Sequence, residues 1–428
     1  MDWGIWYMGH KELIDFCKRH KRIFCYGAGN YGKVIYEFLL ENNIKVEQFI
    51  VTNCRENDKE YRDTPIHSIY DVLPVEDDVG LIIGVREDCH REIKDLLRAA
   101  GVSKYFAVIK ECFTDVECHT SYALSSYRND NKVCVLLYHR VCTLPTDIWS
   151  LAASPDLFET HIKFFKENYN IIKFDDDWSK INETSLVITF DDGYADNFYY
   201  ALPILEKYKV PATIFVCTGN ISTTKEFWWD ELERIIFSTD KTRYYFLPYN
   251  EWLSFSGYED KVDACQKIRL FLKGLLPKER ENFLFTMMEE LKVGSENREY
   301  NRSLSENELL KLASSPWITI GGHTVTHNML SAEPREMQQW EITTSKERIE
   351  KIINRKMTAF AYPFGDKQDI NDYSIECTRN AGYKKAATTT AGLANHEGDS
   401  FRIPRNTMPL YSEINDVQRH LRKICSLL

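Results

Sequence analysis

The amino-terminal quarter of the chain alternates short apolar runs with helix-like segments. Runs with the length and β-branched or aromatic composition of buried strands lie at residues 22–26, 46–51, 81–85 and 105–109. Helices are predicted between them at residues 34–41 and 87–100. Strands that alternate with helices are typical of a parallel sheet, so this part of the chain is predicted to form a small α/β domain.

Two apolar runs in the rest of the chain end in residues that carry chemistry. The run at 186–190 is followed by Asp191-Asp192-Gly193, and the run at 318–320 leads through two glycines into His323-x-x-x-His327. Loops that leave the strand ends of an α/β fold converge on one site. The four-residue spacing predicts that both imidazoles lie on one side of a helical turn.

Together these motifs predict a divalent metal site. Two imidazoles and one carboxylate fill three positions around a cation and leave the others open, as in catalytic rather than structural sites, and the second carboxylate remains available as a base. Taken alone, Asp-Asp-Gly is more often a surface turn and a lone histidine more often a buried core residue. The histidine pair just past a strand end favours metal binding.

Over residues 132–408 the chain resembles the polysaccharide deacetylase family, also called the NodB-homology domain or carbohydrate esterase family 4. The stretches that carry the resemblance lie at residues 133–141 (VCVLLYHRV), 189–197 (TFDDGYADN), 210–216 (VPATIFV), 323–327 (HTVTH), 360–365 (FAYPFG) and 401–405 (FRIPR). The resemblance implies a distorted (β/α) barrel that hydrolyses an N-acetyl or O-acetyl group on a saccharide. It also implies one divalent cation, Zn²⁺ first, with Co²⁺ or Ni²⁺ as alternatives.

The resemblance also assigns roles to residues. Asp192, His323 and His327 would hold the metal, and Asp191 would be the general base. The family's general acid is a histidine in a Leu-x-His motif near the carboxyl end of the domain, and no such motif occurs after residue 363. Leu-x-His occurs instead at 137–139, as in circularly permuted members, so His139 is the candidate acid, with a purely structural histidine at a strand end as the alternative.

A second departure concerns the arginine that orients the base in the family. The position is occupied by Ala361, and Arg402 and Arg405 are the candidates to replace it, although either could pair with a surface carboxylate instead. The next three residues, Tyr362, Pro363 and Phe364, are expected at the substrate, with the Phe364 backbone N–H as an oxyanion donor.

A helical insertion is predicted at about residues 223–315. Near its start, Trp228 and Trp229 are candidates to line a substrate cleft, with Asp230 holding a sugar hydroxyl. Aromatic side chains on an amphipathic helix are more often part of the core, and we expect this of at least one of the two tryptophans.

The first domain contains a glycine motif, formed by Gly27, Gly29 and Gly32 between its first predicted strand and helix. The domain resembles the Rossmann-like amino-terminal domain of sugar-modifying acyltransferases, and the motif could cradle the diphosphate of a nucleotide or nucleotide-sugar. The second strand ends in Thr52-Asn53, so the acid that would hold a ribose diol is absent and NAD binding is disfavoured. Tight packing of strand against helix is an equally good reason for the glycines.

Composition limits the remaining possibilities. A length of 428 residues is enough for two or three domains, and we predict two, at 1–125 and 126–428. The formal net charge of −10 disfavours nucleic acid or an anionic membrane as a main partner. Twelve cysteines without a Cys-x-x-Cys pair indicate reduced thiols. Without a signal-like start or a run long enough to span a membrane, we expect a cytoplasmic protein.

The predicted function is therefore metal-dependent deacetylation of a saccharide or saccharide precursor for surface polysaccharide. Three alternatives remain open. The barrel could hydrolyse another amide, it could be a carbohydrate-binding protein with a vestigial site, or the glycine motif could belong to a nicotinamide-dependent oxidoreductase. The oligomeric state is not predicted.

Overall fold

The structure, a computed structural model, describes residues 10–52, 59–75, 78–85, 89–102, 104–108 and 132–410, and residues 414, 417, 418, 420, 421 and 424. They form two compact units, with residues 10–108 in the first and 132–410 in the second. The predicted boundary at residues 125–126 lies outside the described residues. Each unit is considered by itself.

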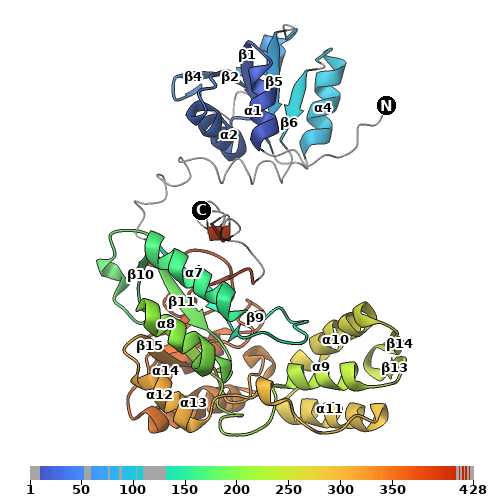
Figure 1. Ribbon diagram of the computed structural model, residues 1–428, viewed down its shortest axis with the longest axis vertical. Helices are drawn as coiled ribbons and strands as arrows, with labels where there is room; N and C mark the ends of the chain where they lie inside the picture. Colours follow the sequence, from blue (N-terminus) through green and yellow to red (C-terminus); the bar gives the residue numbers. More distant parts are fainter. Residues whose placement is uncertain are drawn as a thin grey trace. The chain divides into compact units, whose positions relative to one another are not determined.

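Unit 1 is a parallel sheet with helices on both faces (Figure 1). Its elements are α1 (His10–Lys18), β1 (Arg22–Tyr26), α2 (Asn30–Glu41), β2 (Val46–Val51), β3 (Glu60–Tyr61), β4 (Thr64–Ser68), α3 (Ile69–Val72), β5 (Val79–Ile83), α4 (His90–Ala99) and β6 (Tyr105–Ala107). The strand order is β3-β4-β2-β1-β5-β6, antiparallel only between β3 and β4. The five parallel strands thus run in the order 3-2-1-4-5, which doubly wound nucleotide-binding sheets share.

The period of two along β1 explains why unit 1 has two cores. Ile23 and Cys25 pack with residues of α1 and α2, whereas Phe24 and Tyr26 pack on the opposite face with residues of α4. A strand with both faces buried reads as a continuous apolar run, which is the pattern seen in the sequence.

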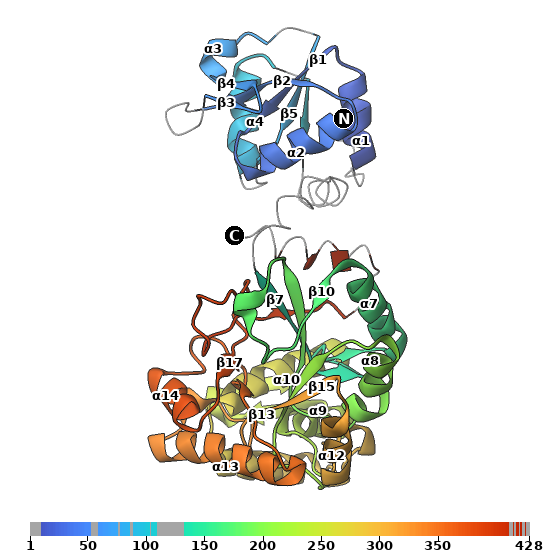
Figure 2. The same cartoon turned by 90° about the vertical axis from the view of Figure 1, so that its left-hand side faces the viewer.

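Unit 2 is a mixed α/β fold built on a curled parallel sheet (Figure 2). Its strands are β7 (Val133–Tyr138), β8 (Arg140–Val141), β9 (Ala152–Ala153), β10 (Asn170–Ile171), β11 (Ser185–Phe190), β12 (Ala212–Val216), β13 (Arg243–Phe246), β14 (Glu251–Ser254), β15 (Ile318–Gly322), β16 (Ala359–Ala361), β17 (Lys385–Ala387) and β18 (Asn406–Thr407). The main sheet has the order β17-β16-β15-β12-β11-β7-β18, and β10 pairs with β11. The predicted α/β fold is confirmed, and the half-barrel sheet is consistent with the predicted NodB-type barrel.

The helices of unit 2 are α7 (Pro155–Asn168), α8 (Leu202–Tyr208), α9 (Trp228–Ser238), α10 (Tyr258–Lys273), α11 (Pro277–Leu291), α12 (Glu306–Ser314), α13 (Arg335–Ile353) and α14 (Asp372–Asn380). Short helical turns are η3 (Trp178–Lys180), η4 (Asn197–Ala201), η5 (Leu247–Tyr249), η6 (Glu299–Asn301) and η7 (Leu330–Ala332). Inside the curled sheet, side chains such as Val135, Val187, Phe215 and Ala361 form the core. Small alanines at the β16 and β17 positions fit a narrow interior.

The region predicted as a helical insertion contains α9, α10 and α11, which lie together beside the barrel with the antiparallel hairpin of β13 and β14 (Figure 1). The hairpin was not predicted. These helices share an apolar core of their own, which includes Leu232, Ile268 and Leu284. In contrast, α12 packs against α13 and β15 of the barrel. No helix in the described part of the chain is long and apolar enough to cross a membrane.

Candidate functional site

The paired acids lie directly beyond the carboxyl end of β11. Asp191 continues the strand, since its backbone N–H donates to the Tyr138 carbonyl at 3.0 Å, while Asp192 takes up a positive φ of 74°. Gly193 comes next at φ 79°, and a Cβ there would lie 3.0 Å from a methyl group of Val216. Glycine therefore suits this turn, and the change of backbone direction lets the two carboxylates face different partners.

The histidine pair lies in a loop after β15, not in the predicted helical turn. Thr324 and His327 both have positive φ, at 67° and 52°, which a regular right-handed helix excludes. The Thr324 hydroxyl accepts the His327 backbone N–H at 3.2 Å. From α13, the Glu341 carboxylate accepts the two intervening backbone N–H groups at 2.7 and 2.9 Å. These contacts hold the loop so that the two rings still lie close, with centroids 4.9 Å apart.

Asp192, His323 and His327 are brought together as the sequence predicted, and all three are buried. The Asp192 Oδ1 atom lies 3.6 Å from His323 Nε2 and 3.2 Å from His327 Nε2. Ligand atoms about 2.1 Å from a tetrahedral cation are about 3.4 Å apart, so the spacing fits a zinc-like ion. Asp192 Oδ1 and His323 Nε2 are buried without a hydrogen-bond partner. Such orphaned atoms are costly unless another group satisfies them, and a bound cation would satisfy both.

The other nitrogen of His323 fixes the ring. Because the Ala361 carbonyl can only accept, the 2.7 Å contact means that His323 Nδ1 carries the proton and Nε2 presents its lone pair to the cluster. The family-like stretch at 360–365 therefore contributes its backbone at Ala361, the position at which the family's arginine is missing. This contact crosses from β15 to β16, and no motif in the sequence predicts it.

Asp191 is held by Arg405. The guanidinium donates two bonds to the carboxylate, from Nη1 at 2.6 Å and from Nη2 at 2.7 Å, and a third from Nε to the Thr388 carbonyl at 2.9 Å. Burial alone would raise the pKa of Asp191, but Arg405 and His323 outweigh it and the pKa lies below its ordinary value. Of the two candidates for the missing arginine, Arg405 is the one beside the base, while Arg402 forms exposed ion pairs with Asp372 and Asp399.

A cavity of about 260 Å³ adjoins the cluster. Its wall includes several of the predicted site residues, namely His139, Asp191, Asp192, Trp228, Trp229, His327 and Phe364. His139 lies just after β7, the strand next to β11, so neighbouring parallel strands deliver the candidate acid and the candidate base to one opening. The indole of Trp229 and the ring of Phe364 lie 4.7 and 4.8 Å from the His327 imidazole.

Tyr362 and Pro363 were expected at the substrate, and the structure does not place either on the wall of this cavity. Tyr362 is fully buried in the core with its ring 5.2 Å from that of Phe360, and Pro363 is buried next to it. Successive side chains of a strand point to opposite faces of the sheet. Ala361 therefore points into the barrel, and Tyr362 points to the other face of the sheet, where it packs against Phe360. Phe364 alone of the three reaches the cavity, at a φ of 60°.

Asp230 meets a protein hydroxyl rather than the open cavity. Its Oδ2 accepts from the Tyr194 hydroxyl at 2.7 Å, and that hydroxyl accepts from Trp229 Nε1 at 2.8 Å. Asp230 is only 3% exposed, and burial raises its pKa to about 7. These contacts fix Trp229 against His327. The sequence did not predict this role, although Tyr194 directly follows Asp191-Asp192-Gly193 and Asp230 directly follows Trp229.

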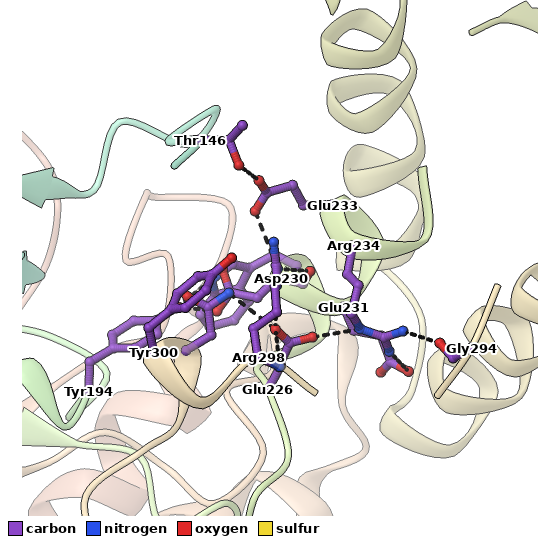
Figure 3. A network of polar contacts seen from close by, with 12 residues as sticks. Thr146, Tyr194, Glu226, Asp230, Glu231, Glu233, Arg234, Gly294, Arg298 and Tyr300 are labelled. Carbon is purple, nitrogen blue, oxygen red and sulfur yellow. Dashed lines mark hydrogen bonds and ion pairs between the residues drawn. The ribbon is translucent and has the colours of Figure 1, made fainter. Parts of the chain in front are cut away.

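A wider polar network anchors the start of the insertion (Figure 3). The buried Glu226 carboxylate accepts from Arg298 at 2.7 Å and from Arg234 at 2.8 Å, and Arg298 also donates to the Asp230 carbonyl at 2.6 Å. Arg234 in turn donates to the Gly294 carbonyl at 2.6 Å. The end of the insertion is thereby tied to its beginning beside the cavity.

Unit 2 also matches a known family by sequence. Residues 179–238 and 278–386 match the family model described as polysaccharide deacetylase. In these two segments the chain is similar in sequence to polysaccharide deacetylases. The gap between the two segments, residues 239–277, contains β13, β14 and α10, so this part of the insertion lies outside the sequence pattern of the family.

The individual proteins that this chain resembles are identical to it at only about a fifth of the aligned positions. Over 283 residues the chain is 21% identical to YxkH of Bacillus subtilis (strain 168), which also bears the family's name, with 64% of this chain and 70% of the relative covered. Similar solved structures include the Streptococcus pyogenes deacetylase PplD in complex with acetate, at 19% identity, a TM-score of 0.44, and 69% and 98% coverage of the two chains. Another is BC0361, a polysaccharide deacetylase from Bacillus cereus, at 21% identity, a TM-score of 0.45 and 69% coverage of both chains.

The glycine motif of unit 1 spans the turn from β1 into α2, with Gly32 in the first turn of that helix, and crowding there accounts for two of its glycines. A Cβ on Gly32 would lie 1.8 Å from the Gly27 carbonyl oxygen, and a Cβ on Gly27, at φ 110°, would lie 2.5 Å from Val85. Gly29 faces open space. Tight packing of strand and helix thus suffices for Gly27 and Gly32. Asn53, at the position of the missing ribose-binding acid, lies outside the described residues.

Proposed function

We propose that the protein is a metal-dependent deacetylase that removes an N-acetyl or O-acetyl group from a saccharide. The observation that carries the proposal is the buried cluster of Asp192, His323 and His327 beside a carboxylate, Asp191, that an arginine holds ionised. A structural metal site would have no need of a second, charged carboxylate at the edge of an open cavity.

The chain's own residues can supply each remaining function. When bound, a zinc-like cation would provide Lewis acidity toward water and the acetyl carbonyl. Asp191 lines the cavity, and Arg405 donates to both of its oxygens, so the carboxylate is held in place to take the proton of the attacking water. His139, on the adjacent strand end, would return a proton to the departing nitrogen or oxygen.

Phe364 supports the developing oxyanion in this scheme. Its backbone N–H makes no hydrogen bond to another group within residues 132–410, and its positive φ is held by neighbouring contacts, including one from the Thr389 hydroxyl to the Phe364 carbonyl at 2.5 Å. A fixed, unpaired N–H at the cavity wall can donate to charge that develops only in the transition state. Trp228 and Trp229 offer apolar faces to the sugar.

Several finer points belong to the same proposal. We take Zn²⁺ as the metal, with Co²⁺ or Ni²⁺ able to replace it, and a circularly permuted motif order with His139 as the acid. The substrate would be a saccharide precursor met in the cytoplasm, and the amino-terminal domain would be Rossmann-like and bind a nucleotide or nucleotide-sugar. The strand order 3-2-1-4-5 and the open space at Gly29 support the last point.

The test is acetate release from a panel of free, nucleotide-linked and lipid-linked N-acetyl and O-acetyl saccharides. Protein stripped of metal is compared with protein reloaded with zinc, and Asp191→Asn is compared with Asp175→Asn, which removes an exposed carboxylate outside the cavity. Release that depends on zinc and on Asp191 but not on Asp175 would support the proposal. Stoichiometric zinc binding with no release from any compound would favour a carbohydrate-binding protein or another amide hydrolase.

A further inference from the structure

One cationic side chain on the cavity wall has no counter-ion within residues 132–410. Arg269 lies on α10 and lines the cavity together with Gln266, one helical turn earlier. Its guanidinium carbon lies 5.4 Å from the centre of the Trp149 ring. Within residues 132–410 it forms no hydrogen bond or ion pair, and its Nε is buried without an acceptor.

The other arginines near the cavity differ in this respect. Arg140 pairs with Asp196 at 2.9 Å, Arg405 pairs with Asp191, and Arg298 pairs with Glu226. Arg280, which lies over Trp228, donates to the Asn328 side chain at 2.6 Å. The protein thus supplies acceptors to its buried guanidinium groups, and Arg269 is left with a ring on one side and the cavity on the other.

The carboxylates of the cavity do not need Arg269. Asp191 already receives two bonds from Arg405, and Asp192 faces the two imidazoles. Burial lowers the pKa of Arg269 somewhat from its ordinary value without a carboxylate to offset it. The wall also holds two other N–H donors that are buried without an acceptor, Trp149 Nε1 and Trp228 Nε1. The cavity wall therefore holds three buried N–H donors without an acceptor, one of which belongs to a cationic side chain.

A ligand that balances this wall is rich in acceptors and negatively charged. Guanidinium groups bind phosphate and carboxylate groups through paired N–H donors, and do so most strongly where water is partly excluded. Arg269 also lies in the segment 239–277, which the match to the deacetylase family leaves out. A residue of this segment can therefore set a preference of this chain without belonging to the chemistry that the family shares.

We propose that the acetylated saccharide carries an anionic group, a phosphate or a carboxylate, close to the acetylated ring, and that Arg269 binds this group. The inference rests on the proposed deacetylase function and narrows its substrate class. Gln266 is placed to donate a further hydrogen bond to the same group, and Trp149 backs the guanidinium and limits its motion.

The test compares Arg269→Gln and Arg269→Lys with Lys267→Gln. Lys267 is on the same helix but pairs with Glu251 at 2.9 Å and does not line the cavity, so its substitution controls for the loss of one positive charge. Three acetylated probes are used with each zinc-loaded protein: the methyl glycoside of N-acetylglucosamine, N-acetylglucosamine 1-phosphate and N-acetylglucosaminuronic acid. Binding of the same probes to metal-free protein is measured by calorimetry, which does not depend on turnover.

The expected result is selective. Arg269→Gln should weaken binding and kcat/KM for one of the two anionic probes by about ten- to a hundredfold, leave the neutral probe within about twofold, and be partly rescued by lysine. The anionic probe that responds identifies phosphate or carboxylate. Two results would overturn the inference. In one, the three variants change binding and kcat/KM equally for all probes. In the other, calorimetry shows that the wild-type protein binds neither anionic probe more tightly than the neutral one. Anion binding through Arg269 without any acetate release would instead count against the deacetylase function alone.

Discussion

The pair formed by Arg405 and Asp191 makes a sharp test of how the site is built. The substitution Arg405→Gln removes the cation and leaves Asp191, whose side chain is 4% exposed, without its two charged hydrogen bonds. Arg402→Gln is the matched control, because Arg402 is three residues earlier and 49% exposed in its side chain, with only surface carboxylates as partners.

The magnitudes of the two changes should differ clearly. Removing one partner of a buried ion pair lowers the free energy of unfolding by about 3–5 kcal/mol, because the remaining charge stays uncompensated in the interior. The Arg405 side chain also loses its bond to the Thr388 carbonyl, which adds about 1 kcal/mol. Exposed ion pairs contribute at most about 1 kcal/mol, so Arg402→Gln should leave the free energy of unfolding almost unchanged.

Urea unfolding followed by tryptophan fluorescence is a suitable assay, because residues 132–410 contain seven of the nine tryptophans and the signal reports mainly on unit 2. The double variant Asp191→Asn with Arg405→Gln completes a mutant cycle. Since neither charge is then left alone, the double variant should be more stable than Arg405→Gln by itself. Two results would refute the buried pair as the cause of the lost stability. One is a double variant whose loss equals the sum of the two single losses, and the other is an Arg405→Gln variant as stable as Arg402→Gln.

Three further outcomes are expected. The variant His327→Ala should lose the zinc that the wild-type protein retains after gel filtration, measured by mass spectrometry, and retention of an equal amount would exclude the ligand set. The variant His139→Ala should keep its zinc but lose about 10²–10⁴-fold in kcat on an N-acetyl substrate, and far less on an acetyl ester with a good leaving group, whereas equal losses on both would argue against a general acid. Asp230 keeps its proton in the folded state up to about pH 7 but loses it near pH 4 when unfolded, so stability should fall by about 4 kcal/mol as pH rises through that window. Urea titrations of Asp230→Asn should show this part of the pH dependence removed, and an unchanged dependence would contradict the buried, protonated carboxyl.

The residues that lie near a strand end were the ones that sequence could place. Apolar runs mark β11 and β15, and the residues directly after each run must emerge at the same edge of a parallel sheet, which brings Asp192 to His323 and His327. The local backbone was not predictable in the same way. Spacing suggested a helical turn for the histidines, but a threonine side chain and Glu341, a residue of α13, stabilise an irregular loop with two left-handed residues.

Contacts between distant parts of the chain set the limit of the sequence prediction. Arg405 and Asp191 are 214 residues apart, and the motif pattern reduced the choice only to Arg402 or Arg405. Burial decides between them, since Arg405 immediately precedes β18 and its side chain enters the barrel, while Arg402 remains at the surface. The hairpin β13–β14 was missed for a related reason, because strands of four residues carry little periodic signal.

The barrel and the insertion contribute different residues to the site, so their roles can be tested separately. The proposed metal ligands and the candidate base lie on loops of the barrel, whereas Trp228, Trp229 and Arg269 lie on helices of the insertion. Two sets of contacts hold the insertion in place beside the barrel. Asp230 and Tyr194 hold Trp229 against His327, and Glu226 binds Arg234 and Arg298, which join the start of the insertion to its later part. A change at Arg269 should therefore alter which saccharide binds while leaving zinc binding intact. A change at Trp229 should disturb both, since its ring centre lies 4.7 Å from that of His327, a proposed metal ligand, and its side chain lines the cavity proposed to hold the sugar.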